Sequence, residues 1–290
     1  MNGNNEQEMN GNNETINDNP LILDGEIIIE EPEQIDVTFP DKRNAKVLRM
    51  TGTGLMIEYP YRPGQILKNA WPCDPWLHAL EIEKTVYRRL GSHPNLARVA
   101  EITDYGIYFE KEELGDLRTY YEGGGEATLS EKVKWCYDLC QVVQYVHEHN
   151  IRHADLNGRN FLISSSRNIV LCDFAGSSID GKPAVTLGEP GYRHPDRELA
   201  RGPTMRSEIH SLGSSIYEIV KGERTYPQFD SINEKGLITK EIQAGNYPDV
   251  TNLTLRDIIS KCWNGSYESA GEVAEAIANS DVYRQFHATK

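Results

Sequence analysis

The stretch IRHADLNGRNFLISSSRNIVLCDFAG, from Ile151 to Gly176, decides the fold of this chain. Within it, Phe161 to Ile163 and Asn168 to Leu171 are short apolar runs separated by a polar turn, which is the pattern of a β-hairpin. A hairpin holds its two ends side by side, so it brings Asn160, just before the first run, next to Asp173, just after the second. The paired oxygen atoms of these side chains suit a hard cation such as Mg²⁺.

Asp155 lies five residues before Asn160 in the segment HADLNGRN, and Asp173 opens the tripeptide DFA. These segments resemble the catalytic loop, H-R-D-L-x-x-x-N, and the metal-binding loop, D-F-G, of the protein kinase superfamily. A D-x-x-x-x-N spacing alone is common by chance, but the three polar residues together in this apolar frame are not. The resemblance implies that Asp155 accepts a hydroxyl proton and that Asn160 and Asp173 bind Mg²⁺.

The resemblance extends toward the N-terminus. Lys68, which follows two apolar residues, matches the strand lysine that contacts the α- and β-phosphates of ATP, and Glu83 matches its partner on the next helix. Taken alone, a lysine in that position is more often a solvated strand residue. Phe109 and Glu110 resemble the start of the hinge between the lobes, so the backbone from Glu110 to Glu112 is expected to bond the adenine edge, with Phe109 walling the pocket.

Two segments downstream resemble other kinase motifs. The run Gly188 to Asp196, GEPGYRHPD, resembles the segment that receives the peptide substrate, and Glu208 to Gly213, EIHSLG, resembles the start of the central helix of the larger lobe. There the resemblance implies that Glu208 braces the catalytic loop through backbone N–H groups.

The chain also departs from the kinase pattern. The glycine-rich loop is reduced to the segment from Gly52 to Ile57, which weakens the expected cover of the phosphates. Ala154 stands where an arginine would read an activation-loop phosphate. Arg159, placed as in tyrosine kinases, supplies a positive charge that Asn157 lacks. Glu189 replaces a threonine and is expected to bring a second carboxylate close to Asp155.

The expected fold is therefore α+β and two-lobed: a small N-lobe sheet with one helix, and a mainly helical C-lobe. The kinase-like domain is expected over residues 44–288, with the N-lobe at 44–110 and the C-lobe at 113–288. The residues that the resemblance assigns to catalysis are Asp155, Lys68, Asn160 and Arg159, and those assigned to the cofactor are Lys68, Glu83, Glu110, Glu112, Asn160 and Asp173.

Hydrophobic periodicity supports this layout. The predicted strands are 46–50, 55–59, 65–69, 97–103 and 107–110, and the predicted helices are 76–90, 128–149, 207–220, 237–243, 255–263 and 268–277. Thr128 and Glu131 form the sequence pattern of a capping box at the start of the longest helix.

Composition limits the partners. The 290 residues include 30 Lys and Arg against 44 Asp and Glu, a net charge of −14, so binding of nucleic acid or anionic membranes through bulk charge is not expected. No apolar run is long enough to span a membrane, and the first residues lack the pattern of a signal peptide. Five scattered cysteines fit a reducing compartment, the cytoplasm, with the nucleus left open.

Three functions stay open at this point. The first is a protein kinase that uses ATP and Mg²⁺ to phosphorylate Ser or Thr of a protein substrate. The second is a pseudokinase that keeps the fold as a nucleotide- or protein-binding module, which the weak glycine loop, Ala154 and Glu189 favour. The third is a small-molecule phosphotransferase like the aminoglycoside and choline kinases, which the segments around Gly188 and Glu208 disfavour.

Residues 1–36, rich in Asn and acidic residues, are predicted to be a disordered tail that the domain does not need for folding, because they offer little apolar surface to bury. A truncated chain starting at Val37 should therefore melt at the same temperature as the full chain in a circular-dichroism experiment. A melting temperature lower by many degrees would mean that the tail packs on the domain.

Overall fold

The computed structural model of the chain describes residues 22–23, 26–27, 44–196, 199 and 202–287. The chain divides into two units at residues 36 and 37. In the first unit, β1 (Ile22–Leu23) and β2 (Glu26–Ile27) pair antiparallel. The remaining residues of the predicted tail lie outside the described ones, so its disorder stays a prediction.

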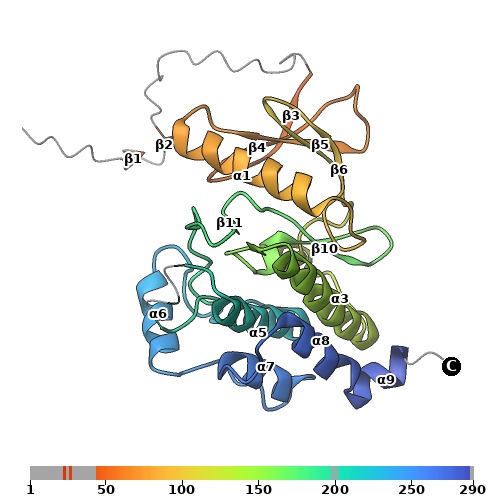
Figure 1. The fold of residues 1–290 in the computed structure, drawn as a ribbon, viewed down its shortest axis with the longest axis vertical. Helices are drawn as coiled ribbons and strands as arrows, with labels where there is room; N and C mark the ends of the chain where they lie inside the picture. Colours follow the sequence, from red (N-terminus) through yellow and green to blue (C-terminus); the bar gives the residue numbers. More distant parts are fainter. Residues whose placement is uncertain (1–21, 24–25, 28–43, 197–198, 200–201, 288–290) are drawn as a thin grey trace, which may run out of the picture. The chain divides into compact units, whose positions relative to one another are not determined.

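The second unit begins with a five-stranded antiparallel sheet (Figure 1). Its strands are β3 (Lys46–Met50), β4 (Gly54–Glu58), β5 (Gln65–Ala70), β6 (Val99–Ile102) and β7 (Gly106–Glu110), in the order β3-β4-β5-β7-β6. The central strand β5 is therefore paired on both sides. This position buries Leu67 and fixes the neighbouring Lys68 in a rigid frame.

Helix α1 (Asp74–Leu90) lies across this sheet (Figure 1). It has Pro75 in its first turn, where no intrahelical N–H is lost, and it ends at Gly91, whose φ of 63° suits glycine. The end of α1 is fastened to the helical half of the unit. Arg89 makes two hydrogen bonds of 2.7 and 2.9 Å to Asp180, and the Tyr145 hydroxyl donates to the carbonyl of Leu90.

The rest of the unit is mainly helical. The helices that the structure describes there are α2 (Leu117–Glu122), α3 (Leu129–Glu148), α5 (Met205–Lys221), α6 (Lys235–Gln243), α7 (Arg256–Trp263), α8 (Ala270–Ala278) and α9 (Asp281–His287). The predicted capping box opens α3: Thr128 accepts from the N–H of Glu131, whose side chain accepts from the N–H of Thr128. Among the described helices, none is long and apolar enough to cross a membrane.

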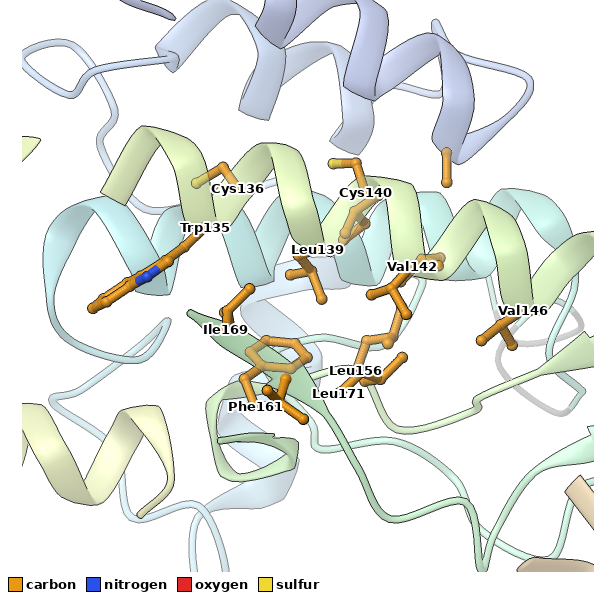
Figure 2. Close-up of a cluster of buried hydrophobic side chains, with 14 of the residues drawn as sticks. Trp135, Cys136, Leu139, Cys140, Val142, Val146, Leu156, Phe161, Ile169 and Leu171 are labelled. Atoms are coloured by element: carbon orange, nitrogen blue, oxygen red, sulfur yellow. The ribbon is translucent and has the colours of Figure 1, made fainter. Parts of the chain in front are cut away.

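The hairpin of the deciding stretch forms as predicted from β9 (Phe161–Ile163) and β10 (Ile169–Leu171), paired antiparallel. In Figure 2 this hairpin lies beneath α3, with Phe161 and Ile169 close to Leu139. All three side chains are almost completely buried. The indole N–H of Trp135 on α3 also donates to the carbonyl of Arg167, 2.7 Å away, which fixes the hairpin turn.

Three short elements complete the region around the hairpin. The 3-10 helix η1 (Gly158–Asn160) leads into β9, and β8 (Ile151–Arg152) pairs with β11 (Ser178–Ile179). The predicted α+β, two-lobed fold is confirmed. The domain limits given above stay predictions. The sequence misses α2 and α9, because helices of six and seven residues are too short to display a helical period.

Helices α5 and α7 approach closely at Gly213. A Cβ atom at this position would lie 2.6 Å from Cβ of Cys262, so Gly213→Ala should lower the free energy of unfolding by about 1–3 kcal/mol, the usual cost of overpacking. The matched control is Gly236→Ala in α6, where nothing lies within 4 Å of the added carbon. This control should be neutral or stabilising by up to about 1 kcal/mol. Urea unfolding of both variants measures the difference, and equal stabilities would contradict the close approach.

Candidate active site

A cleft of about 680 Å³ opens between the sheet and the helical half of the second unit. Strands β3, β4 and β5, the segment after β7, the loop before β9 and the segment after β10 all contribute to its lining. The structure brings together in this cleft all the residues that the sequence analysis singled out as site residues: Lys68, Glu83, Glu110, Glu112, Asp155, Arg159, Asn160 and Asp173.

Lys68 is the ionic centre of the cleft. Its Nζ lies 2.6 Å from Oδ1 of Asp173 and 2.7 Å from Oε2 of Glu83. Glu83 is completely buried on α1, and its other oxygen accepts from the N–H of Phe174 at 3.1 Å. Strand β5, helix α1 and the segment after β10 are thus joined through one ammonium group.

The pKa values in this group follow from burial and from the pairing. Burial disfavours the charged form of Lys68, but Asp173 and Glu83 outweigh it and raise the pKa of the ammonium. Burial raises the pKa of Glu83. Burial also acts to raise the pKa of Asp173, yet the charge and hydrogen bond of Lys68 hold it below its ordinary value. Asp173 therefore stays ionised in the cleft.

Asn160 and Asp173 are the candidate ligands of a cation. The hairpin places them together, since the N–H of Cys172 donates to the carbonyl of Asn160 at 3.0 Å. The amide nitrogen of Asn160 donates to Asp155, which leaves its amide oxygen for a metal, and the Asp173 side chain is 42% exposed. Among the described residues, no cluster of three or more His, Cys, Asp or Glu side chains could hold a metal. Two oxygen ligands suit Mg²⁺, which commonly takes the rest from phosphates and water.

Asp155 is held by hydrogen bonds to both of its carboxylate oxygens. Oδ1 accepts from the side-chain amide of Asn157 at 2.9 Å and from the backbone N–H of Glu189 at 3.1 Å, and Oδ2 accepts from Asn160 at 3.1 Å. Burial raises the pKa of Asp155, and the neighbouring Asp173 adds to the effect. A carboxylate with a raised pKa is a better proton acceptor than an exposed one.

Glu208 braces the loop that carries Asp155 as predicted. Its carboxylate accepts from the backbone N–H groups of His153 at 3.0 Å and Ala154 at 2.6 Å, and it contacts Nε2 of His147 at 2.8 Å. Ala154 has a φ of 72° and Asp173 a φ of 65°, values that non-glycine residues rarely adopt. Such conformations cost about 1–3 kcal/mol each and persist where neighbouring contacts hold them.

The structure corrects the expectation for Glu189. Its carboxylate does not act as a second charge on Asp155, because it binds the guanidinium of Arg118 on α2 at 2.7 and 2.9 Å. Only its backbone N–H reaches Asp155. The raised pKa of Asp155 therefore comes from burial and from Asp173 rather than from Glu189.

Arg118 is the important site residue that the sequence analysis misses. Besides Glu189 it binds Glu218 at 2.7 Å and donates to the hydroxyl of Tyr192 at 3.0 Å. Glu218 in turn accepts from the backbone N–H of Gly158 in the catalytic loop at 2.7 Å. A side chain at Gly158 would collide with that carboxylate, so the glycine in the loop is required by this contact.

The hinge and Arg159 complete the cleft. The backbone N–H of Glu110 donates to the carbonyl of Arg98 at 2.9 Å, and none of the described residues accepts from the N–H of Glu112. Phe109 lies in the cleft wall as expected. The Arg159 side chain is exposed in the cleft, and no described carboxylate pairs with it.

Comparison with known proteins agrees with this geometry. Residues 74–277 match the family described as the protein kinase domain, and the chain belongs to that family.

Among the similar proteins, mitogen-activated protein kinase kinase kinase mom-4 of Caenorhabditis elegans is 25% identical over 211 residues, covering 67% of this chain and 38% of its own length. Mitogen-activated protein kinase kinase kinase ANP1 of Arabidopsis thaliana is 26% identical over 202 residues, with 64% and 29% covered. Protein kinase wis1 of Schizosaccharomyces pombe is 28% identical over 172 residues, with 54% and 28% covered. The chain thus spans well under half the length of these relatives.

The buried ion pairs of Arg118 with Glu189 and Glu218 are expected to contribute to the stability of the fold. Arg118→Met leaves Glu189 and Glu218 without their cation, so it should lower the free energy of unfolding by about 3–5 kcal/mol, as removal of one partner of a buried ion pair does. The matched control is Arg89→Met, which removes an equally well-aligned but exposed pair with Asp180 and should cost at most about 1 kcal/mol. Chemical unfolding compares the two variants. If both variants lose a similar free energy of unfolding, the buried ion pairs of Arg118 contribute no more than an exposed pair.

Proposed function

We propose that this chain is a catalytically competent protein kinase that transfers the γ-phosphoryl group of ATP to a Ser or Thr hydroxyl of a protein substrate. The observation that carries the proposal is the position of Lys68, within 2.7 Å of both Glu83 and Asp173. Kinases need this strand lysine paired with the helix glutamate and the metal-binding aspartate in place at the same time. The assembled ion pairs therefore support a kinase in its working arrangement.

In this proposal each cleft residue has one task. Lys68 contacts the α- and β-phosphates, and Asn160 and Asp173 hold Mg²⁺, which when bound neutralises charge on the phosphate oxygens. Arg159 adds positive charge beside the transferred group. Asp155 orients the acceptor hydroxyl and accepts its proton, for which its raised pKa suits it.

The hinge would recognise adenine through its backbone. The carbonyl of Glu110 and the N–H of Glu112 are the donor–acceptor pair proposed to bond the base edge, with Phe109 behind it. Burial raises the pKa of the Glu112 carboxyl, and the neighbouring Glu110 and Glu113 add to this. The binding is assigned to the backbone at Glu112, because none of the described residues accepts from its N–H.

Observations outside the cleft support the proposed acceptor residue, Ser or Thr, and the proposed cellular compartment. The relatives include proteins named as mitogen-activated protein kinase kinase kinases and as serine/threonine-protein kinases, which favours Ser or Thr as the acceptor. All five cysteines are free thiols, which is consistent with the proposed reducing compartment, the cytoplasm. The family match also favours a protein substrate over a small molecule.

One contact favours a second candidate, a binding module with little turnover. Nη1 of Arg49 on β3 lies 3.3 Å from Oδ2 of Asp116, the residue that caps α2. Both residues line the cleft, and their ion pair crosses it from the sheet to the helical half. A nucleotide must displace or accommodate this pair, which would slow exchange and favour a binding role.

The two candidates separate in a turnover assay with radiolabelled ATP, Mg²⁺ and generic protein substrates. Under the kinase proposal, Asp155→Asn keeps the shape and removes the base, so turnover should fall by about two to four orders of magnitude. The affinity of the Asp155→Asn variant for ATP should stay within a few-fold of that of the wild type, because Asp155 contributes little to ground-state binding.

The control is Thr85→Ala, which alters an exposed side chain on the same helix as Glu83 and should leave turnover unchanged. A wild-type protein that binds ATP but shows no turnover above Asp155→Asn would favour the binding module instead.

A further inference from the structure

The turn from Thr51 to Gly54 joins β3 to β4 at the edge of the cleft, where Thr51 and Gly52 line it. The Thr51 hydroxyl closes this turn from within. It donates to the carbonyl of Gly54 at 3.0 Å, and it accepts from the backbone N–H groups of Gly54 at 3.1 Å and Thr53 at 3.3 Å. Two backbone donors of the turn are thus already bonded.

A second turn in the same sheet, from Thr103 to Gly106, has nearly the same construction. The Thr103 hydroxyl donates to the carbonyl of Gly106 at 3.0 Å and accepts from its N–H at 3.1 Å. The backbone N–H of the threonine donates to the carbonyl of the glycine in both turns, at 2.8 Å for Thr51 and 2.9 Å for Thr103. Both turns follow the sequence pattern T-x-x-G.

The two turns flank the same end of β5. Gly54 pairs with Ala70, Gly106 pairs with Asn69, and a Cβ atom on either glycine would collide with the backbone of β5. The second turn is bound to α1 by Lys84, whose ammonium donates to the carbonyl of Asp104 at 2.8 Å. A turn of this type therefore serves to close a hairpin tightly against the central strand.

The first turn occupies the place where protein kinases cover the phosphates with a glycine-rich loop. Trp71 fastens it further, since its backbone N–H donates to the carbonyl of Thr53 and its indole N–H to the carbonyl of Thr51, both at 3.1 Å. An N–H group that donates inside its own turn cannot donate to a phosphate until that bond breaks.

We infer that Thr51 is a specificity-determining residue of the nucleotide site, because its hydroxyl withholds the N–H groups of Thr53 and Gly54 from the phosphates. The cleft then holds a nucleotide through the hinge, Lys68 and the metal ligands, without a contribution from the turn. This inference rests on the proposed nucleotide-binding function and concerns the same cleft.

The test is calorimetric titration of the full chain with Mg·ATP and, separately, with adenosine. Thr51→Ala removes the hydroxyl and puts no other atom in its place, so it frees both N–H groups. It should bind Mg·ATP about tenfold more tightly, which is the contribution of one hydrogen bond to a charged oxygen, while adenosine binding changes less than about twofold.

Two controls accompany this variant. Thr103→Ala removes the equivalent hydroxyl from the equivalent turn outside the cleft. This variant should lose as much thermal stability as Thr51→Ala and should bind Mg·ATP no more tightly than the wild type. Thr51→Ser keeps the hydroxyl and should bind both ligands like the wild type.

The outcomes separate the inference from the function on which it rests. If the wild type binds Mg·ATP and Thr51→Ala binds it no more tightly, or gains equally for adenosine, the inference is overturned and the proposed function stands. If none of the proteins binds either ligand, the nucleotide site is wrong and the inference falls with it. Should Thr51→Ala not fold, the amide resonances of Thr53 and Gly54 in the wild type decide. They should stay in place at ATP saturation, and large shifts would overturn the inference.

Discussion

The buried ammonium of Lys68 is the constraint on which the rest of the cleft depends. Removing a charge from water costs several kcal/mol, and only close opposite charges offset this cost. Strand β5 presents Lys68, helix α1 must therefore present Glu83, and the segment after β10 must present Asp173. The long apolar face of α1, the central place of β5 in the sheet and the left-handed backbone at Asp173 all serve to bring three distant segments to one point.

Helix α5 provides the complementary constraint from the other side. Glu208 and Glu218 lie ten residues apart on this helix, about 2.8 turns, so their side chains leave it on adjoining faces about 80° apart. Glu208 accepts the N–H groups of His153 and Ala154, and Glu218 accepts the N–H of Gly158. The loop that carries Asp155 is thereby held at both of its ends by carboxylates on a single rigid helix. Acidic side chains are suited to this, because a carboxylate accepts from backbone N–H groups that have no partner in regular secondary structure.

The sequence predicts those parts of the molecule whose signals are local. The hairpin around residues 161–171, the capped helix α3 and the gathering of Asp155, Asn160 and Asp173 all follow from periodicity and spacing within about forty residues. Arg118 does not, because it lies in a six-residue helix, and its partners Glu189 and Glu218 are 71 and 100 residues away in the chain. The internal bonding of the Thr51 turn is equally hidden, since T-x-x-G does not reveal which way a hydroxyl points.

The attachment of α1 at its C-terminal end determines how the cleft can be rearranged. Arg89 is bonded to Asp180, and the carbonyl of Leu90 to Tyr145, so that end of the helix is coupled to the helical half of the unit. A movement that separates Glu83 from Lys68 while these bonds hold is a rotation of α1 about its C-terminal end at Leu90. The displacement of the helix then grows from Leu90 toward Asp74.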